Sequence, residues 1–440
     1  MFRLRRGREK DVEGKKRVLT LKLVALTVPA SILATVLALN FTASEKKIRE
    51  EIETHYSVHD PQFLRAMGTL VGPALVRGNK VETLVNGDEI FPAMLEAIRE
   101  AEKTITFETY IYWSGAIGKE FVDALSERAR AGVRVFVLLD WAGTAKMEES
   151  YLEEMETAGV QIEKYHPLHW YHLGRMNNRT HRRLLIVDGR IGFTGGVGIG
   201  DEWTGDAQDA DHWRDNHYRI QGPVVAQMQA AFMDNWIESR GTVLHGEEFF
   251  PELPSVGQHA AQMFRSSPLE GSESMRLMVL LSLDAAEESI LIAHSYFVPD
   301  DLVTEALVGA LERGVEIKIL LPGSKIDVPV VRKASRGRWG ELLEAGAQIH
   351  EYQPTMYHCK AMVVDDVWVS IGSTNFDNRS FRLNDEANLN VYDREFAREQ
   401  IALIEEDLSR SRRITLEEWR DRPWQEKLGE RLAGLFRSQL

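Results

Sequence analysis

The segment YHCKAMVVDDVWVSIGSTN, residues 357–375, is predicted to form two strands joined by a tight turn. Side chains two apart on a strand point to the same face, so His358 and Lys360 should lie side by side while the intervening cysteine faces away. A lysine ammonium neutralises a phosphate oxygen, and a histidine can attack phosphorus or move a proton near neutral pH. Ser373 and Asn375, at the end of the second strand, add hydrogen-bond donors. This segment therefore predicts part of a site for phosphoryl transfer.

A second copy of the pattern, HRRLLIVDGRIGFTGG, lies at residues 181–196. It places Arg183 two residues after His181 and an aspartate seven residues after it, the same spacing as in the later copy. A lone histidine is more simply explained as a core residue, but its repetition with the same neighbours favours chemistry. Two facing histidines suit a two-step transfer, in which one becomes a phosphohistidine and the other protonates the leaving alcohol and deprotonates the incoming one. Cations beside them would hold the phosphate.

The elements that must position these histidines are repeated too. One half opens with MLEAIREAEKTITFETYIYW and the other with VLLSLDAAEESILIAHSYFVP, and each reads as three helix–strand pairs followed by a hairpin. Tyr110 aligns with Tyr296. The alternation predicts an α/β fold with a mixed, largely parallel sheet covered by helices on both faces. We expect two α-β-α sandwich repeats related by a pseudo-twofold axis.

The N-terminal residues predict a membrane anchor. A basic tail at residues 1–17 is followed by Leu23–Phe41, 19 residues without a charge, close to the roughly 20 that span a bilayer. A cleaved signal peptide, the alternative, has an apolar core of only about 7–15 residues. We therefore predict an uncleaved transmembrane helix at residues 18–41. Nine basic residues precede the span, which predicts a cytoplasmic N-terminus and a body outside, and a body on the cytoplasmic side stays open as the alternative.

Composition limits the possible partners. The chain has 440 residues, 44% hydrophobic and 27% charged, which is typical of a globular protein of two or three domains. Its net charge is −14, and since residues 1–50 hold twelve Lys/Arg and five Asp/Glu, residues 51–440 carry −21. An acidic body argues against a large nucleic-acid surface. After the anchor we expect a linker at 42–78, a first domain at 79–246 and a second at 259–440.

Several stretches resemble a known family. HCKAMVVD is a complete H-x-K-x-x-x-x-D motif with GSTN behind it, and the chain resembles the phospholipase D superfamily. FETYIYW, NRTHRRLLIVDGRIGFTGG, HWRDNHYRIQGP and NFDNRSFRLNDEANL resemble its bacterial cardiolipin synthase branch, over about residue 80 to the C-terminus. The resemblance implies one active site made from both halves, with no metal and no other cofactor.

The resemblance also implies roles for individual residues. It favours His181 as the nucleophile and His358 as the general acid and base, with the reverse assignment open. An acid later in each half usually orients the imidazole. Glu386, 28 residues after His358, fits that role, and Asp215 in HWRDNHYR would be its counterpart for His181.

Other motif residues are expected to support the site. Asp188 and Asp365, the motif aspartates, should be structural and hold the hairpins. The first half departs from the family pattern at two positions, with Arg183 in place of the usual lysine and Gly198 in place of the usual asparagine. Arginine keeps the positive charge and offers a two-pronged contact to phosphate, so we expect activity to survive.

The expected reaction joins two molecules of phosphatidylglycerol into cardiolipin and glycerol, at the inner (cytoplasmic) membrane, with no nucleic acid involved. Three alternatives stay open: a phospholipase D that hydrolyses or transphosphatidylates phospholipids, a phosphodiesterase acting on nucleic acid, and a membrane scaffold with a decayed first half. At the C-terminus, Trp424, Leu428, Leu432, Leu435 and Phe436 form one helical stripe, which fits either an interfacial membrane helix or packing against the body.

Overall fold

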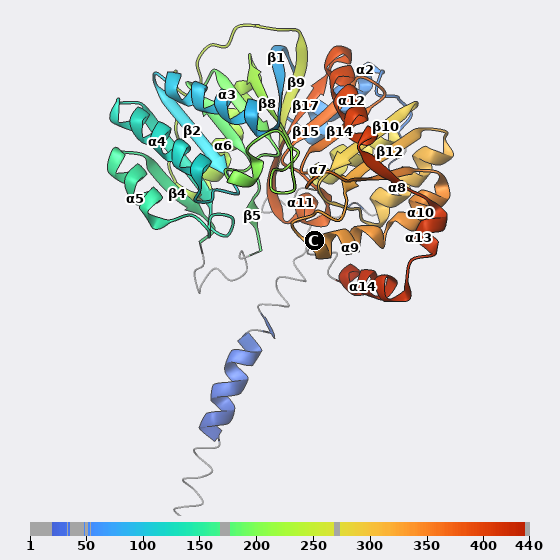
Figure 1. The fold of residues 1–440 in the computed structure, drawn as a ribbon. Coiled ribbons are helices and arrows are strands. Elements are labelled where there is room, and N and C mark those ends of the chain that lie inside the picture. The colour runs from blue at the N-terminus through green and yellow to red at the C-terminus, as the bar shows by residue number, and fades with distance from the viewer. Residues whose placement is uncertain are drawn as a thin grey trace, which may run out of the picture. The chain divides into compact units, whose positions relative to one another are not determined.

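The computed structural model describes residues 20–32, 34–35, 48, 52, 54–167, 177–267 and 273–435 (Figure 1). The chain divides into a small unit, residues 1–45 with 168–177, and a large one, residues 46–167 with 178–440. In the small unit residues 20–32 and 34–35 are helical and exposed. Among the described residues no helix is both long and apolar enough to cross a bilayer. Residues 18, 19, 33 and 36–41 of the expected span, and the whole basic tail, lie outside that part of the chain.

The first half of the large unit follows the predicted alternation of helices and strands. Its strands are β1 (Val76–Val85), β2 (Thr104–Thr109), β3 (Arg134–Asp140), β4 (Gln161–Tyr165), β6 (Leu184–Val187), β7 (Ile191–Gly195) and β8 (Asn216–Gln221). Its helices are α3 (Asn86–Glu100), α4 (Ala116–Arg130), α5 (Glu149–Ala158) and α6 (Val225–Arg240), with a short 3-10 turn, η3 (Asp201–Trp203).

The second half repeats this order. Its strands are β9 (His259–Ser266), β10 (Ser289–His294), β12 (Glu316–Pro322), β13 (Gln348–Tyr352), β14 (Lys360–Val364), β15 (Trp368–Gly372) and β17 (Asn384–Tyr392). The matching helices are α7 (Ser274–Asp284), α8 (Asp301–Glu312), α10 (Trp339–Ala345) and α12 (Arg394–Ser409). Extra elements of this half are β11 (Phe297–Val298), α9 (Pro329–Arg336), β16 (Phe376–Asp377), α11 (Asn378–Arg382), β18 (Ser411–Ile414), α13 (Leu416–Arg420) and α14 (Trp424–Gly434).

One sheet runs through both halves, in the order β18-β13-β12-β10-β14-β15-β17-β9-β1-β8-β7-β6-β2-β3-β4. Read outward from the β1–β9 pair, both halves have the same strand order, with β18 added at the edge of the second half. Figure 1 shows the two halves in blue-green and in yellow-red. The expectation of a largely parallel sheet is wrong. Among the strands on this path only β2–β3–β4 and β10–β12–β13 pair in parallel, because only these are joined by crossover helices, whereas hairpins and returning strands pair antiparallel.

Three layers result from the alternation of side chains along the strands. On β3, Val135, Val137 and Leu139 face the cluster formed with α3, α4 and α5, while Phe136 and Leu138 face the opposite way. That opposite face belongs to a core shared by the halves, to which α6 and α12 both contribute. The outer face of the second half is covered by α7, α8 and α10. Helices on both sheet faces match the α/β expectation.

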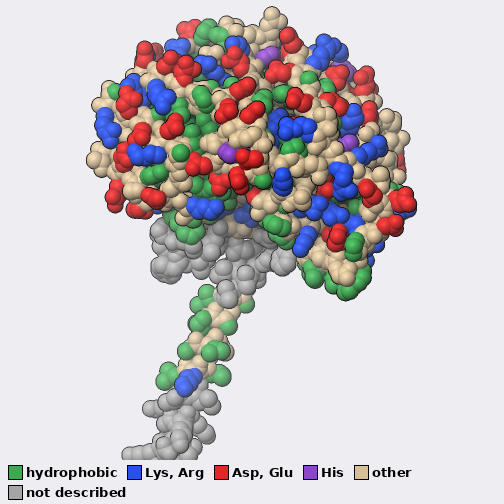
Figure 2. Space-filling view, viewed as in Figure 1, with side chains coloured by type: hydrophobic (Ala, Val, Ile, Leu, Met, Phe, Trp, Pro, Cys, Tyr) green, Lys and Arg blue, Asp and Glu red, His purple; other side chains and the backbone are tan. Residues whose placement is uncertain are grey.

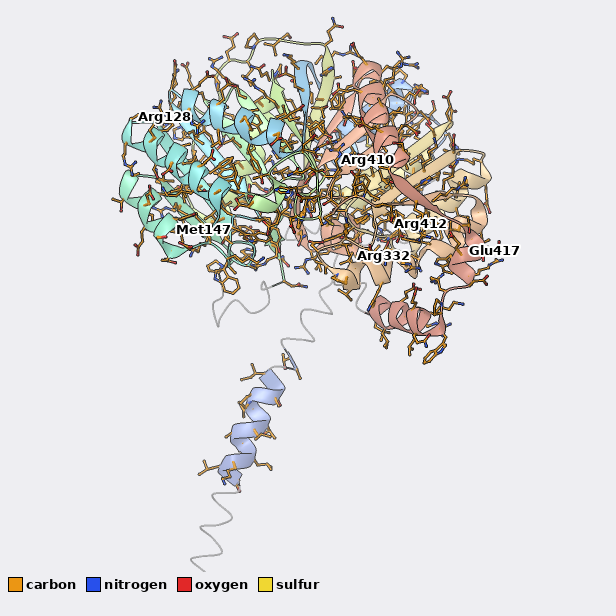
Figure 3. The ribbon with its side chains drawn as sticks, viewed as in Figure 1. Arg128, Met147, Arg332, Arg410, Arg412 and Glu417 are labelled. Atoms are coloured by element: carbon orange, nitrogen blue, oxygen red, sulfur yellow. The ribbon has the colours of Figure 1, made fainter. Side chains whose placement is uncertain are left out.

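The segment expected as a linker contributes to the second-half core. It contains α2 (Pro61–Ala66), capped by Asp60, and a single π-helical turn, η1 (Met67–Val71). Phe63 and Met67 are buried there, and the ring of Phe63 meets Trp368 edge-on at 5.0 Å. At the outer edge of this half, Arg332 of α9 and Arg412 of β18 both form ion pairs with Glu351. Figure 3 labels the two arginines.

Candidate active site

The two motif aspartates fasten the hairpins that carry the histidine segments. Asp188 follows β6 with φ 52° and accepts three backbone N–H groups at the start of β2, from residues 102, 103 and 104, at 2.9, 2.7 and 2.8 Å. Asp365 follows β14 with φ 47° and accepts those of residues 287, 288 and 289, each at 2.8 Å. Asparagine and aspartate tolerate the left-handed backbone that such turns need. Both carboxylates lock a hairpin to a central strand.

The segment that carries each histidine forms backbone hydrogen bonds with the opposite half. Before His181, β5 (Arg179–Thr180) pairs in parallel with β17 of the second half, and the His181 N–H donates to the Asp385 carbonyl at 2.8 Å. In the same way, the His358 N–H donates to the Arg214 carbonyl of the first half at 2.8 Å. The backbone therefore brings both histidines to the boundary between the halves.

The orienting acids are exchanged between the halves. His181 Nδ1 lies 3.0 and 3.1 Å from the two carboxylate oxygens of Glu386, and His358 Nδ1 lies 2.7 Å from Asp215 Oδ2. The expected pairing, Glu386 with His358 and Asp215 with His181, is therefore wrong. The backbone contacts between the halves explain the exchange. Glu386 directly follows the residue whose carbonyl accepts the His181 N–H, and Asp215 directly follows the residue whose carbonyl accepts the His358 N–H.

Arg183 determines which ring nitrogen of His181 carries the proton. Its guanidinium donates to the His181 carbonyl at 3.0 Å and, through the other terminal nitrogen, to His181 Nε2 at 3.1 Å. A guanidinium has no acceptor, so Nε2 must carry a lone pair and the ring proton must sit on Nδ1, where Glu386 accepts it. The unprotonated Nε2 beside a fixed positive charge is the form of histidine that attacks phosphorus.

Lys360 is placed against His358 in the second half. Its Nζ donates to the His358 carbonyl at 2.7 Å and to Ser295 Oγ at 3.0 Å, and lies 3.2 and 3.3 Å from the two ring nitrogens. Burial lowers the pKa of Lys360 to about 7, with Arg183 adding to the effect. A bound anion would favour the charged form, so this lysine is suited to hold a phosphate.

Both histidines are almost enclosed, with 7% of His181 and 6% of His358 exposed. Burial is the main cause that lowers their pKa values to about 4, so both imidazoles are neutral at pH 7. The cations of both halves add to this: Lys360 also lowers the pKa of His181, and Arg183 that of His358. The two histidine–cation pairs therefore act on one another across a single site that attracts anions.

The orienting carboxylates stay ionised in this site. Burial opposes ionisation of Asp215, but His358 and the two nearby cations outweigh it and lower its pKa. The pKa of Glu386 is lowered as well, because His181 and the hydroxyl of Ser373 outweigh burial. Each carboxylate can thus accept the Nδ1 proton and stabilise an imidazolium when one forms.

Ser373 and Asn375 position other residues of the site. Ser373 Oγ donates to Glu386 Oε2 at 2.5 Å and accepts the N–H of Ala387 at 3.0 Å, so its hydroxyl holds the carboxylate that orients His181. Asn375 Oδ1 accepts from Ser295 Oγ at 2.7 Å, which in turn accepts from Lys360. Both had been expected to contact phosphate, but the contacts that the structure shows for these side chains lead to Glu386 and to the lysine.

In the first half, glycines stand at the two positions that match Ser373 and Asn375, and neighbouring side chains leave no room there for a Cβ. A Cβ on Gly196, which matches Ser373, would lie 2.1 Å from an oxygen of Asp215. A Cβ on Gly198, which matches Asn375, would lie 2.7 Å from Cβ of Ile111. The shorter acid Asp215 is instead held by the indole N–H of Trp203 at 3.0 Å. Glycine at position 198 therefore fits the space that Ile111 leaves.

Aromatic rings and one arginine complete the site. The ring of Tyr110 lies 5.1 Å from that of His181, and Trp203 and Trp213 lie 5.3 and 5.5 Å from the ring of His358. Sequence reasoning had noted Tyr110 only as part of the repeat. It missed Arg182, which is fully buried beside His181 and donates to the Ala231 carbonyl at 2.7 Å. The available signal was a second arginine directly after His181, at the position where the later copy of the motif has Cys359.

Known proteins match both the sequence and the fold. The profile of the family described as "Cardiolipin synthase, PLD-like domain" matches residues 94–236 and 279–408. Cardiolipin synthase A of Pseudomonas syringae pv. syringae (strain B728a) is 36% identical over 376 residues, which are 85% of this chain and 78% of the relative. Cardiolipin synthase 2 of Bacillus anthracis is 35% identical over 346 residues, 78% of this chain and 67% of the relative.

Solved structures agree on the fold. Phosphatidylserine synthase from Haemophilus influenzae Rd KW20 superposes with a TM-score of 0.66 at 15% identity, covering 86% of this chain and all of that one. Polyphosphate kinase from Porphyromonas gingivalis superposes with a TM-score of 0.52 at 14% identity, covering 86% of this chain and 54% of that one. At such identities the likeness supports the arrangement of the two halves and says nothing about substrate.

Proposed function

Because the chain belongs to the family of cardiolipin synthases with phospholipase D-like domains, we propose that it makes cardiolipin from two molecules of phosphatidylglycerol. The observation that carries the proposal is the pair of histidines, each beside a cation and each oriented by a carboxylate of the opposite half. This arrangement supplies a nucleophile, a general acid and base, and positive charge for a phosphodiester, which are the parts that phosphatidyl transfer needs.

In the first step, His181 Nε2 attacks the phosphorus of one phosphatidylglycerol. His358, which takes up a proton from water when the anionic substrate binds, gives this proton to the leaving oxygen as the bond from phosphorus to the glycerol headgroup breaks. The negative phosphodiester opposes the effect of Lys360 and Arg183 on His358, which raises its pKa and makes it a competent acid. Glu386 stabilises the positive charge that grows on His181, and the product is a phosphatidyl-histidine.

In the second step, the headgroup hydroxyl of another phosphatidylglycerol enters where glycerol left. His358, now neutral, takes the hydroxyl proton while the oxygen attacks phosphorus and the bond to His181 Nε2 breaks. Cardiolipin is formed and both histidines return to their first state. Lys360 and Arg183 hold the phosphate in this proposal, and Asn375 positions Lys360 through Ser295.

We extend the proposal to the membrane. Residues 18–41 form a single-pass anchor in the inner (cytoplasmic) membrane, supported by 19 uncharged residues and by the helical residues 20–32. Residues 79–246 and 259–440 act as two phospholipase D-like domains about a pseudo-twofold axis, supported by the matching strand order. The partners are phosphatidylglycerol or a related phospholipid and the membrane itself.

The test is turnover in defined vesicles. Full-length protein in phosphatidylglycerol liposomes should release one glycerol for each cardiolipin formed, and His181→Ala should do neither. Brief incubation with ³²P-labelled lipid should leave label on the protein that is labile to acid and stable to alkali, as expected of phosphohistidine. If neither product forms, or if the His181→Ala protein behaves like the parent, the proposal fails. Phosphatidic acid instead of cardiolipin would indicate water as the acceptor and a phospholipase D.

A further inference from the structure

The helix α14 presents an apolar stripe to solvent. Trp424, Leu428, Leu432 and Leu435 are 68%, 48%, 54% and 75% exposed. At 3.6 residues per turn these four positions fall within about 80° of one another around the helix. The opposite side of α14 packs against the body, where Ala433 is buried in a cluster with α9. Figure 2 shows this stripe as a hydrophobic patch at the lower right, where Figure 1 places α14.

A basic cavity of about 510 Å³ adjoins the stripe. Within the described residues its charged lining consists of five cations and one carboxylate: Arg338, Arg420, Arg422, Lys427, Arg431 and Glu430. Residues 51–440 carry a net charge of −21, so a group of cations this dense runs against the average of the body. Such a cavity attracts an anion of several atoms, such as a phosphate headgroup.

The cations of this cavity are only partly neutralised. Arg422 forms a two-pronged ion pair with Glu430, with contacts from 2.7 to 3.1 Å, which uses the one carboxylate of the lining. Two further cations pair with carboxylates outside the lining, Arg338 with Asp301 at 2.9 Å and Arg420 with Glu344 at 2.6 Å. Lys427 donates to the Arg420 carbonyl at 2.6 Å and has no carboxylate partner among the described residues. Arg431 has no hydrogen bond or ion pair to any described residue. Lys427 and Arg431 lie on the helix side next to the apolar stripe, between it and the cavity.

The stripe and the cavity connect to the catalytic centre through packing. Ala433 of α14 contacts a cluster that contains Val331 of α9 and Val298 of β11, with Tyr296 packed against it. Ser295, which accepts from Lys360, directly precedes Tyr296. In Figure 1, α14 lies at the lower edge of the large unit, below β5 and α11.

We propose that the stripe of α14 and the adjoining basic cavity form a docking surface for an anionic bilayer. Apolar residues flanked by cations on one helix are the pattern of helices that lie in the membrane interface, where leucine and tryptophan enter the headgroup region and cations contact lipid phosphates. A second copy of this chain is a poorer occupant, because its acidic body would have to match an apolar strip only four residues long. The surface lies in the second half, apart from the predicted N-terminal anchor in sequence, and does not depend on phosphatidyl transfer.

The test uses a fluorescent label on the stripe of the full-length protein. The chain has one cysteine, Cys359, which is 1% exposed, so a thiol introduced by Leu432→Cys is labelled selectively under native conditions. Glu153→Cys, on an exposed position of α5 in the other half, is the matched control. A His181→Ala background keeps the lipid composition constant. In vesicles of phosphatidylcholine with 30% phosphatidylglycerol, the emission of the label at position 432 should shift to shorter wavelength, and that at 153 should not.

Charge removal sharpens the test. Lys427→Gln with Arg431→Gln should weaken docking about fivefold for each lost charge, and salt should reverse the shift in the parent. The proposal is overturned if the labels at 432 and 153 report the same watery environment in anionic vesicles. It is overturned equally if vesicles of phosphatidylcholine alone give the full shift, or if the shift in detergent grows with protein concentration, which would reveal self-association. Since the readout needs no turnover, failure of the proposed reaction would leave it intact.

Discussion

Asp215 and His358 lie in different halves of the chain, 143 positions apart, yet the carboxylate oxygen of one is 2.7 Å from Nδ1 of the other. The contact between Glu386 and His181 repeats the relationship in the opposite direction, over 205 positions. Each half thus supplies one histidine and the carboxylate for the other histidine. A lesion in one half is expected to disable the imidazole of its neighbour.

This exchange predicts distinct phenotypes for the two carboxylates. Asp215→Asn should impair His358, which protonates the leaving group, and Glu386→Gln should impair His181, the nucleophile. With phosphatidylglycerol, each variant should lose about 10²–10⁴-fold in kcat. With phosphatidyl-p-nitrophenol, whose leaving group needs no proton, release of p-nitrophenol should recover in Asp215→Asn and stay slow in Glu386→Gln.

The control for this experiment is the corresponding pair of histidine variants. His358→Ala should follow Asp215→Asn, and His181→Ala should follow Glu386→Gln. Recovery of the Glu386→Gln protein instead of the Asp215→Asn protein would reverse the roles of the histidines. Equal recovery, or none, would contradict the assignment of one carboxylate to each step.

Lys360 predicts a loss of affinity at alkaline pH. Its pKa is lowered to about 7, chiefly by burial, so the unliganded protein carries the ammonium below pH 7 and loses it above. Since the phosphodiester stays negative throughout, kcat/KM should fall as pH rises from 6 to 9. In Lys360→Gln, kcat/KM should be about 10²–10³-fold lower at pH 6. Its fall between pH 6 and pH 9 should be smaller than in the parent, because the variant has no lysine to deprotonate. An equal decline in Lys360→Gln would assign the pH dependence to another group.

Gly198 predicts a steric coupling with Ile111. Gly198→Asn, which restores the usual residue of the family, places a Cβ 2.7 Å from the Ile111 side chain and should destabilise the protein by about 1–3 kcal/mol. Combining it with Ile111→Ala should recover part of that loss, which thermal unfolding of the two single variants and the double variant would measure. Gly309→Asn, where a Cβ meets only Arg313 at 3.8 Å, is the control. A Gly198→Asn protein as stable as the parent would show that this contact relaxes freely.

Arg182 is predicted to hold the halves together. It contacts the Ala231 carbonyl and Asp234 of α6, and lies 3.9 Å from Asp385 of β17. Arg182→Met would leave a buried carboxylate without its cation, at a cost of about 3–5 kcal/mol. Arg240→Met, which removes the partly exposed ion pair between Arg240 of α6 and Glu163 of β4, should cost less than about 1 kcal/mol. Denaturant unfolding compares the two, and equal losses would exclude a special role for Arg182.

The repeat and its motif were accessible from sequence, because histidine, cation and aspartate fall on fixed positions of a strand and its turn. The same two-residue period places His358 and Lys360 together without knowledge of the rest. Which carboxylate serves which histidine was not accessible. That depends on β1 pairing with β9, a contact between segments with no shared local pattern.

The roles of Ser373 and Gly198 were not accessible from sequence either, because they depend on residues distant in the sequence that the fold places beside them. The Ser373 hydroxyl turns to Glu386 because β15 and β17 are adjacent, and Gly198 is required because Ile111 fills its space. The overestimate of parallel pairing has the same origin. Helix–strand alternation describes only part of each half, while the returning strands β8 and β17 give weak periodic signals and pair antiparallel.

Through the β1–β9 pair the two halves associate like the two subunits of a dimer, although they belong to one chain. Residues 241–258, which join the halves, contain no helix or strand, so the connection works as a tether that raises the effective concentration of one half for the other. Cutting it would leave two fragments, each with one newly unpaired strand, β1 or β9, and half of every histidine–carboxylate contact. Those edges are templates for each other, so the fragments are expected to reassemble by strand addition and regain together what neither holds alone.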